Sequence, residues 1–132
     1  MRIGELAKAT GTKAETIRYY EREGILPAAD RTDSNYRDYA DDHLVTLTFV
    51  RRARELGFSM AQVRELLALS DHNEKPCQDV DRLVQQQLTE IKRKIVDLTA
   101  LRDELGQMLR SCQADKIGEC HIIGSLGRHA GV

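Results

Sequence analysis

Two sets of largely apolar residues recur at helical spacing near the start of the chain: Ile3, Leu6 and Ala7, then Ala14, Ile17 and Tyr20. Gly11 lies between the sets, where a residue in the left-handed conformation commonly ends a helix. Thr12 and Glu15 have the spacing of a capping box at the start of the second helix. Two short helices joined by a glycine-containing turn predict a helix-turn-helix.

The stretch from Ala28 to Asp42 is polar and rich in turn-forming residues, which predicts a loop or a short β-hairpin, that is, a wing. Helical spacing then returns in two further segments, with inward-facing sets Leu44, Leu47, Val50 and Ala53, then Val63, Leu66 and Leu67. Asp41 or Asp42 is placed to cap the first of these helices, and Ser59 the second. Residues 1–70 therefore predict a winged helix-turn-helix domain, followed by a linker, residues 71–78, that contains Cys77.

Residues 79–111 contain no proline and predict one long helix. Its apolar positions alternate steps of four and three, with one shorter step: Val84, Leu88, Ile91, Ile95, Leu98, Leu101, Leu105 and Met108. Such a helix extends about 48 Å at 1.5 Å per residue, and little chain is left to cover the stripe. We expect a dimerisation helix that pairs with a second copy of the chain, followed by a loop and tail in residues 112–132.

Composition fits a mainly α protein: 41% of the 132 residues are apolar, and tryptophan is absent. No apolar segment approaches the roughly 20 residues that span a bilayer, and no leader pattern is recognisable, so we expect a cytoplasmic protein without a membrane partner. The net charge is −1, and residues 1–60 contain ten basic and ten acidic side chains. Bulk charge therefore does not indicate a nucleic-acid partner, and such an interpretation depends on where the cations lie.

Four segments together resemble the MerR family of metal-responsive bacterial transcription regulators: "IGELAKATGTKAETIRYYEREGIL", "NYRDY", "RRARELGFSMAQVRELL" and a cysteine-bounded loop followed by "HIIGSLG". The resemblance covers nearly the whole chain. It implies a winged helix-turn-helix that binds a palindromic promoter operator as a symmetric dimer, with an antiparallel coiled coil between the subunits. It also implies repression without metal and, with metal, a DNA distortion that lets RNA polymerase engage the promoter.

The resemblance also assigns DNA-contacting residues. The second helix would enter the major groove, the wing would bind phosphate and sugar, and the following helix would add cations: Thr16, Arg18, Tyr19 and Tyr20, then Tyr36, Arg37 and Tyr39, then Arg54. An arginine fork suits a guanine edge or a phosphate, and a tyrosine hydroxyl reaches backbone oxygens. For Tyr19, Tyr20 and Tyr39 the alternative is a half-buried ring that holds the wing against the helix. Asp38 departs from the family pattern, and we expect it to point away from phosphate or to lower affinity.

The three cysteines, Cys77, Cys112 and Cys120, indicate a soft metal ion, because thiolates select zinc, cadmium, lead, mercury or monovalent copper over magnesium and calcium. The long helix separates Cys77 from Cys112 by about 45 Å, so one chain cannot bring them to one ion. If two copies pack antiparallel, Cys77 of one copy approaches Cys112 and Cys120 of the other. A buried Cys77 and a Cys112–Cys120 disulfide are the alternatives.

Three thiolates leave a smaller excess charge around a divalent ion than around a monovalent one, which favours a divalent ion. The resemblance agrees, because copper, silver and gold sensors usually carry serine at the position of Cys77. Cadmium or lead is our first expectation, zinc the second and mercury the third. His121 follows Cys120 and is either a fourth ligand or a solvent-facing residue. The spacing of Cys112 and Cys120 also fits a copper(I)-responsive member of the family.

The alternatives to a regulator are an enzyme and a metal storage protein or metal chaperone. An enzyme is not expected, because the chain has no nucleophile elbow, phosphate-binding loop or recognisable pair of carboxylates. A metal storage protein or metal chaperone would also use cysteines, but it would not need a wing or a recognition helix.

Overall fold

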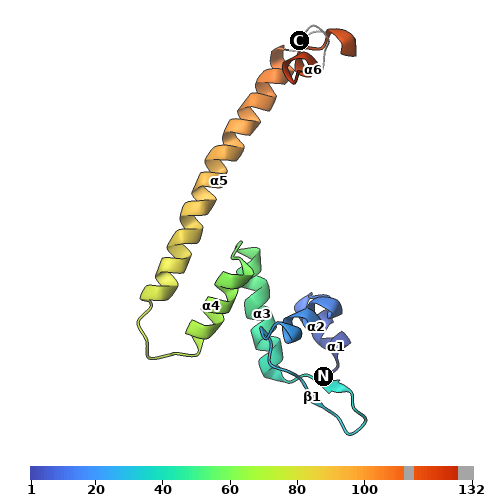
Figure 1. The fold of residues 1–132 in the computed structure, drawn as a ribbon, viewed down its shortest axis with the longest axis vertical. Coiled ribbons are helices and arrows are strands. Elements are labelled where there is room, and N and C mark those ends of the chain that lie inside the picture. Colours follow the sequence, from blue (N-terminus) through green and yellow to red (C-terminus); the bar gives the residue numbers. More distant parts are fainter. Residues whose placement is uncertain (112–114, 128–132) are drawn as a thin grey trace. The chain divides into compact units, whose positions relative to one another are not determined.

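The computed structural model describes residues 1–111 and 115–127. Its elements follow in the order α1 (Ile3–Thr10), α2 (Ala14–Arg22), β1 (Asp30–Arg31), β2 (Arg37–Asp38), α3 (Asp41–Glu55), α4 (Met60–Ser70), α5 (Gln78–Ser111), the 3₁₀ turn η1 (Ile117–Glu119) and α6 (His121–Ser125) (Figure 1). The mainly helical architecture predicted from the sequence, with a small hairpin and one long helix, is confirmed. The chain forms two compact units, residues 1–84 and residues 85–132. No helix within the described ranges is long and apolar enough to cross a membrane.

The first unit contains two clusters of buried side chains, one packed on the first half of α3 and the other on its second half. One cluster joins α1, α2, the end of the wing and α3: Leu6, Ile17, Leu26, Tyr39 and Leu47. The other joins α3 to α4: Ile25, Val50, Ala53, Phe58 and Val63. Burying a large apolar side chain contributes about 1.5 to 3 kcal/mol, so α3 is the common support of the helix-turn-helix and of α4. Apart from Ala14, the inward-facing positions that the sequence predicted lie in these clusters or pack against them.

Helix α1 ends as predicted, because Gly11 adopts the left-handed conformation with φ 64°. Helix α4 also begins as predicted. The Ser59 hydroxyl accepts the Gln62 backbone N–H at 3.2 Å, and the Gln62 side-chain oxygen accepts the Ser59 N–H at 2.8 Å. These reciprocal bonds satisfy two backbone donors that the first turn would otherwise leave unpaired.

Two predicted helix starts are wrong by one or two residues. Helix α2 begins at Ala14 with Lys13 at the N-cap and no side-chain capping bond, so Thr12 does not cap it. Helix α3 begins at Asp41, which places the two aspartates inside the first turn rather than at the cap. The buried His43 fulfils the capping role instead, since its Nδ1 accepts the Ala40 backbone N–H at 3.0 Å.

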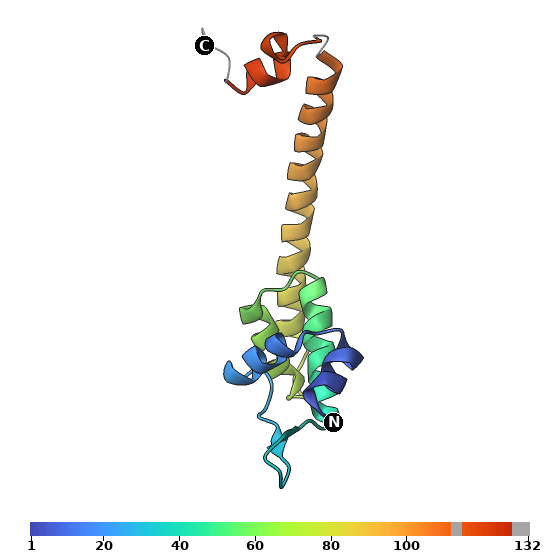
Figure 2. The same cartoon turned by 90° about the vertical axis from the view of Figure 1, so that its right-hand side faces the viewer.

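The wing is an antiparallel hairpin in which Asp30 pairs with Asp38 and Arg31 with Arg37. It projects away from the helices of its own unit (Figure 2). The residue that follows it, Tyr39, donates its backbone N–H to the Met1 carbonyl at 2.8 Å. The end of the hairpin is therefore fixed to the start of the chain.

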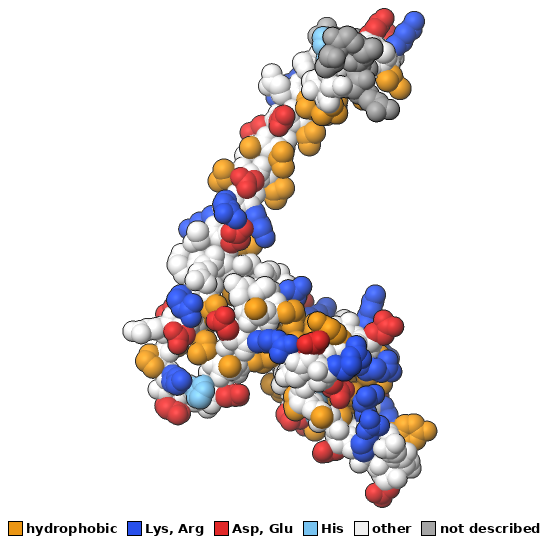
Figure 3. Space-filling model, in the orientation of Figure 1, with side chains coloured by type: hydrophobic (Ala, Val, Ile, Leu, Met, Phe, Trp, Pro, Cys, Tyr) orange, Lys and Arg blue, Asp and Glu red, His pale blue; other side chains and the backbone are white. Residues whose placement is uncertain are grey.

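Helix α5 has 34 residues, close to the predicted bounds. Its apolar stripe is largely exposed on the described chain: Val84, Leu88, Ile91, Ile95, Leu98, Leu101 and Leu105. In Figure 3, orange hydrophobic side chains run along the helix. An exposed stripe at this spacing is what a coiled-coil helix presents to a partner.

Candidate nucleic-acid interface and metal-ligating cysteines

A cavity of about 250 Å³ lies between the start of α1, α2 and the wing, and we call it the wing groove. It is lined by Arg2, Ile3, Arg18, Arg31, Asn35, Tyr36 and Arg37. Four arginines from separate parts of the first unit thus converge on one hollow. In Figure 3 the blue side chains of Lys and Arg gather over α1, α2 and the wing.

Contacts within the first unit orient several of these cations. The Arg2 guanidinium lies 4.2 Å from the centroid of the Tyr36 ring, a cation–π arrangement. Arg31 Nη1 donates to the Asn35 carbonyl at 3.0 Å across the turn of the hairpin. Fixed guanidinium forks lined along a groove suit phosphate oxygens, which accept bidentate hydrogen bonds.

A second cavity, of about 560 Å³, lies on the side of the helix-turn-helix turn, and we call it the turn groove. It is lined by Gly11, Thr12, Lys13, Thr16, Tyr20, Arg51, Arg54 and Glu55. Arg51 Nη1 donates to the Thr10 carbonyl at 2.5 Å, and Arg54 Nη1 donates to the Phe58 carbonyl at 2.8 Å. Arg51 also pairs with Glu55, which reduces the positive charge on this side.

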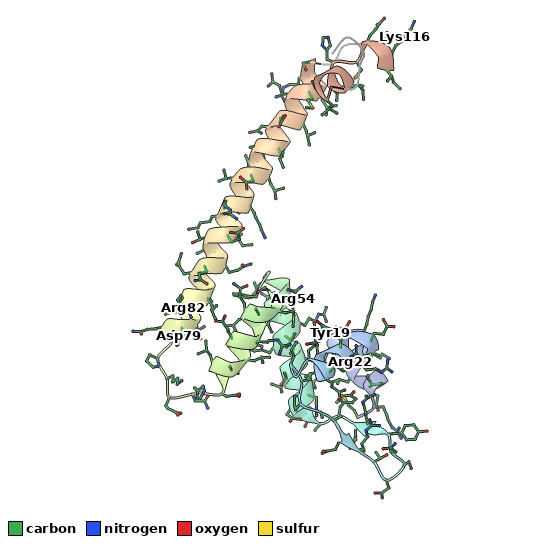
Figure 4. All side chains as sticks on the ribbon, in the orientation of Figure 1. Tyr19, Arg22, Arg54, Asp79, Arg82 and Lys116 are labelled. Atoms are coloured by element: carbon green, nitrogen blue, oxygen red, sulfur yellow. The ribbon has the colours of Figure 1, made fainter. Side chains whose placement is uncertain are left out.

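The predicted DNA-contacting residues divide between the two grooves. Arg18, Tyr36 and Arg37 line the wing groove, whereas Thr16, Tyr20 and Arg54 line the turn groove. Tyr19 is 45% exposed on α2, with its ring 6.0 Å from that of Tyr20. Figure 4 labels Tyr19 and Arg22 on α2 and Arg54 on α3. The recognition helix thus carries predicted residues toward both grooves.

Tyr39 lies apart from this set, because its side chain is 2% exposed. Its hydroxyl donates a hydrogen bond to Glu21 Oε1. Burial and this bond raise the pKa of Tyr39 from 10.0 to about 12, so the phenol keeps its proton to a higher pH than an exposed tyrosine does. The ring fits the alternative that the sequence left open, namely a side chain that holds the wing against the recognition helix. Asp38, the departure from the family pattern, accepts a hydrogen bond from the Met1 ammonium at 2.9 Å.

Reasoning from the sequence did not single out Arg2, Arg31 or Lys13, which also line the grooves. Arg31 offered a signal, since it lies in the stretch predicted to form a loop or a short β-hairpin, where the structure pairs it with Arg37. Arg2 offered none in its own neighbourhood, because its ring partner Tyr36 lies on the wing, far along the sequence.

The structure describes two of the three cysteines, Cys77 and Cys120. Cys77 is exposed, and its carbonyl accepts the Asp81 N–H at 2.8 Å, which places it at the first turn of that helix. Cys120 is partly buried between η1 and α6. Cys112 lies outside the described residues. Among the residues that are described, no group of three or more His, Cys, Asp or Glu side chains could hold a metal ion. A three-thiolate site therefore needs Cys112, a second chain, or both.

His121, the open candidate for a fourth ligand, is exposed at the start of α6. It lines a cavity of about 380 Å³ between the end of α5 and α6, together with Glu104, Gln107, Met108, Ser111, Ile122 and Ser125. These neighbours are mixed in polarity, and the thioether of Met108 is the one sulfur ligand among them.

Known proteins resemble the chain along nearly its whole length. The family of MerR HTH family regulatory proteins matches residues 1–70, and the family described as MerR, DNA binding matches residues 44–108. Heavy metal-dependent transcription regulator 2 of Rhizobium meliloti is 41% identical over 126 residues, which cover 96% of this chain and 86% of that protein. The mercuric resistance operon regulatory protein of Bacillus cereus is 40% identical over 126 residues, covering 95% and 96%.

A solved structure is similar to the chain in fold as well as in sequence. The crystal structure of the transcription regulator PbrR691 from Ralstonia metallidurans, in complex with lead(II), superposes with a TM-score of 0.82 at 40% identity. The match covers 96% of this chain and 98% of that one. The chain therefore belongs to the MerR family of helix-turn-helix transcriptional regulators, and it is not an enzyme.

Proposed function

We propose that the chain is a heavy-metal-dependent regulator that binds a palindromic promoter operator as a homodimer. Without metal it represses. With a soft divalent ion bound by thiolates it distorts the DNA so that RNA polymerase engages the promoter and transcribes genes for metal efflux or resistance. The observation that carries the DNA-binding part is the convergence of Arg2, Arg18, Arg31 and Arg37 on the wing groove beside the recognition helix.

In this proposal, α2, the wing and the turn groove each contact a different part of the DNA. Helix α2 presents Arg18 and the exposed Tyr19, the kind of side chains that read base edges or bind phosphate. The wing presents Tyr36 and Arg37, which suit phosphate and sugar. Arg54 and Thr16, in the turn groove, suit the backbone on the other side of α2.

A binding assay tests the DNA surface. A duplex enriched by the parent protein from a random library serves as the operator, and affinity is measured at one stated salt concentration. We expect Arg18→Ala and Arg37→Ala each to weaken binding by about 1 to 3 kcal/mol, with helix content and dimerisation retained. Lys8→Ala, on the exposed side of α1, is the matched control and should bind like the parent. Unchanged affinity in both arginine variants would remove the proposed surface.

For the metal we propose Cys77 of one chain with Cys112 and Cys120 of the other as ligands. The chemistry of the donor set supports this, since three thiolates suit soft ions. Cadmium or lead is the first choice, zinc the second and mercury the third. The relatives named for heavy metals, for mercury resistance and for a lead(II) complex support a heavy metal without choosing among these ions.

A transcription titration at buffered free concentrations of cadmium, lead, zinc, mercury and copper(I) tests the ion. We expect Cys77→Ser to lose most of the response to cadmium, lead and zinc while still binding DNA, and Cys112→Ser and Cys120→Ser to lose every response. Mixed dimers of Cys77→Ser and Cys112→Ser subunits should recover one intact site. Full divalent induction in Cys77→Ser would contradict the shared site, and induction of the parent by copper(I) alone would favour the copper-responsive alternative.

A further inference from the structure

Glu21 lies near the end of the recognition helix α2, and its side chain is 11% exposed. One carboxylate oxygen accepts the hydroxyl of Tyr39, directly after the second strand of the wing. The other accepts the backbone N–H of Ala29, directly before the first strand, at 3.4 Å, and lies 3.8 Å from Arg37 Nε. A single carboxylate therefore contacts the segments that enter and leave the hairpin.

These contacts matter because the hairpin has little structure of its own to fix its direction. Each strand has two residues, and an isolated two-stranded hairpin is marginal in water. Hydrogen bonds to a buried charged acceptor are stronger and more directional than neutral ones. The orientation of the wing is therefore set by the groups at its base.

The partner of Glu21 is itself rigidly held. The Tyr39 ring packs in the buried cluster with Leu6 and Leu47 and meets His43 edge-on, with ring centroids 5.3 Å apart. His43 in turn places its Nε2 3.0 Å from the Pro27 carbonyl. Because Tyr39 cannot easily move, its bond to Glu21 fixes the base of the wing relative to α2.

We propose that Glu21 is a positioning residue for DNA binding: through Tyr39 and Ala29 it sets the distance between the base-reading helix and the phosphate-binding wing. This rests on the proposed DNA-binding function. Glu21 itself touches no DNA. Its effect on affinity acts through the wing side chains Tyr36 and Arg37, which the correct hairpin direction brings to the same operator as α2.

The test is a double-mutant cycle on operator affinity. Tyr39→Phe removes the hydroxyl and keeps the buried ring. We expect it to weaken operator binding about tenfold, which corresponds to about 1.4 kcal/mol of binding free energy. In an Arg37→Ala background, where the wing has already lost its main cation, the same change should alter affinity by less than about twofold. A purely structural role would instead give the same fold-change in both backgrounds. Thr48→Val, which removes an exposed hydroxyl bonded within α3, is the matched control and should leave affinity unchanged.

Two further measurements keep the inference testable if Tyr39→Phe folds poorly. Glu21→Gln keeps an acceptor for the Tyr39 hydroxyl but loses the charge that faces Arg37, so we expect a smaller loss, about threefold, that again disappears without Arg37. Trypsin should also cleave after Arg31 at least several-fold faster in Tyr39→Phe than in the parent, in the absence of DNA. Equal fold-changes in both backgrounds with unchanged cleavage would overturn the positioning role and leave DNA binding intact. Failure of the parent protein to select any duplex would overturn the proposed function itself.

Discussion

Replacing Gly11 with alanine should destabilise the helix-turn-helix through two separate effects. The residue has φ +64°, a conformation that costs an L-amino acid about 1 to 2 kcal/mol. An added Cβ would also lie 2.2 Å from Arg51 Nη1, so the Arg51 guanidinium would have to move away from the turn. That movement breaks the bond from Arg51 to the Thr10 carbonyl, a contact between the turn and α3.

The second effect is the smaller one. Arg51 is about half exposed, so losing its bond costs about 0.5 to 1.5 kcal/mol rather than the value of a buried charged bond. With the backbone term, we expect Gly11→Ala to lower the free energy of unfolding by about 1.5 to 3.5 kcal/mol.

Two other glycines separate the cost of the left-handed backbone from the cost of displacing Arg51. Gly24 also has a positive φ, +73°, but a Cβ there would meet nothing within 4 Å, so Gly24→Ala should lose about 1 to 2 kcal/mol. Gly4 lies inside α1 with nothing within 4 Å, and Gly4→Ala should gain about 0.5 to 1 kcal/mol from helix propensity.

The assay is urea unfolding followed by circular dichroism, at one fixed protein concentration because a dimer's stability depends on concentration. In an Arg51→Ala background, Gly11→Ala should lose no more than Gly24→Ala does. If Gly11→Ala cost the same with and without Arg51, the clash would not be the cause. If it cost nothing, the left-handed turn itself would be refuted.

Three further outcomes are expected. Ile91→Asp should give a monomer in analytical ultracentrifugation, because each side chain of the stripe that is buried in the dimer contributes about 1.5 to 3 kcal/mol. Val96→Asp, which lies off the stripe, should leave the dimer intact, and a monomeric parent protein would contradict the prediction. Arg2→Ala should weaken operator binding and lower the slope of log affinity against log salt by about one, if the cation over Tyr36 binds a phosphate; an unchanged slope would exclude that contact. The pKa of Tyr39 is raised to about 12 from its ordinary value near 10, so the folded state holds this proton more tightly than the unfolded state does. The free energy of unfolding should therefore fall as pH rises between these two values. Tyr39→Phe should show a smaller fall, and an equal fall would argue against the raised pKa.

Local patterns in the sequence predicted the elements well where the signal lies within one or two turns. The helical spacing of Leu47, Val50 and Val63 identified buried faces, and Gly11 and Ser59 identified helix ends. In each case the residue acts on neighbours three or four positions away. The architecture followed, since a helix-turn-helix, a wing and one long helix leave few ways to arrange the chain.

The sequence could not decide a side chain's role where that role depends on a distant partner. For Tyr39 the family resemblance implied a DNA contact and the sequence left a structural ring open as the alternative; the bond that bears on this choice runs to Glu21, 18 positions earlier. His43 was not singled out, although it caps α3 and reaches the Pro27 carbonyl. Neither contact has a periodic signature, because tertiary packing creates both. The metal ligands stay a prediction, since Cys112 lies outside the described residues and the site needs a second chain.

The near-zero net charge of the chain hides a locally basic surface, and several acidic side chains of the first unit contact other parts of the same unit. Glu21 bonds Tyr39, Glu55 pairs with Arg51 and Arg52, and Glu23 pairs with Arg64. The lining residues of the wing groove include four arginines and no carboxylate, and of these arginines Arg37 also lies 3.8 Å from Glu21. Long-range attraction depends on the whole charge, whereas phosphate binding depends on the local cations, which salt screens over about 10 Å at 0.1 M. It follows that association with DNA should be steered weakly at a distance, and that affinity should still fall steeply with salt once the groove is engaged.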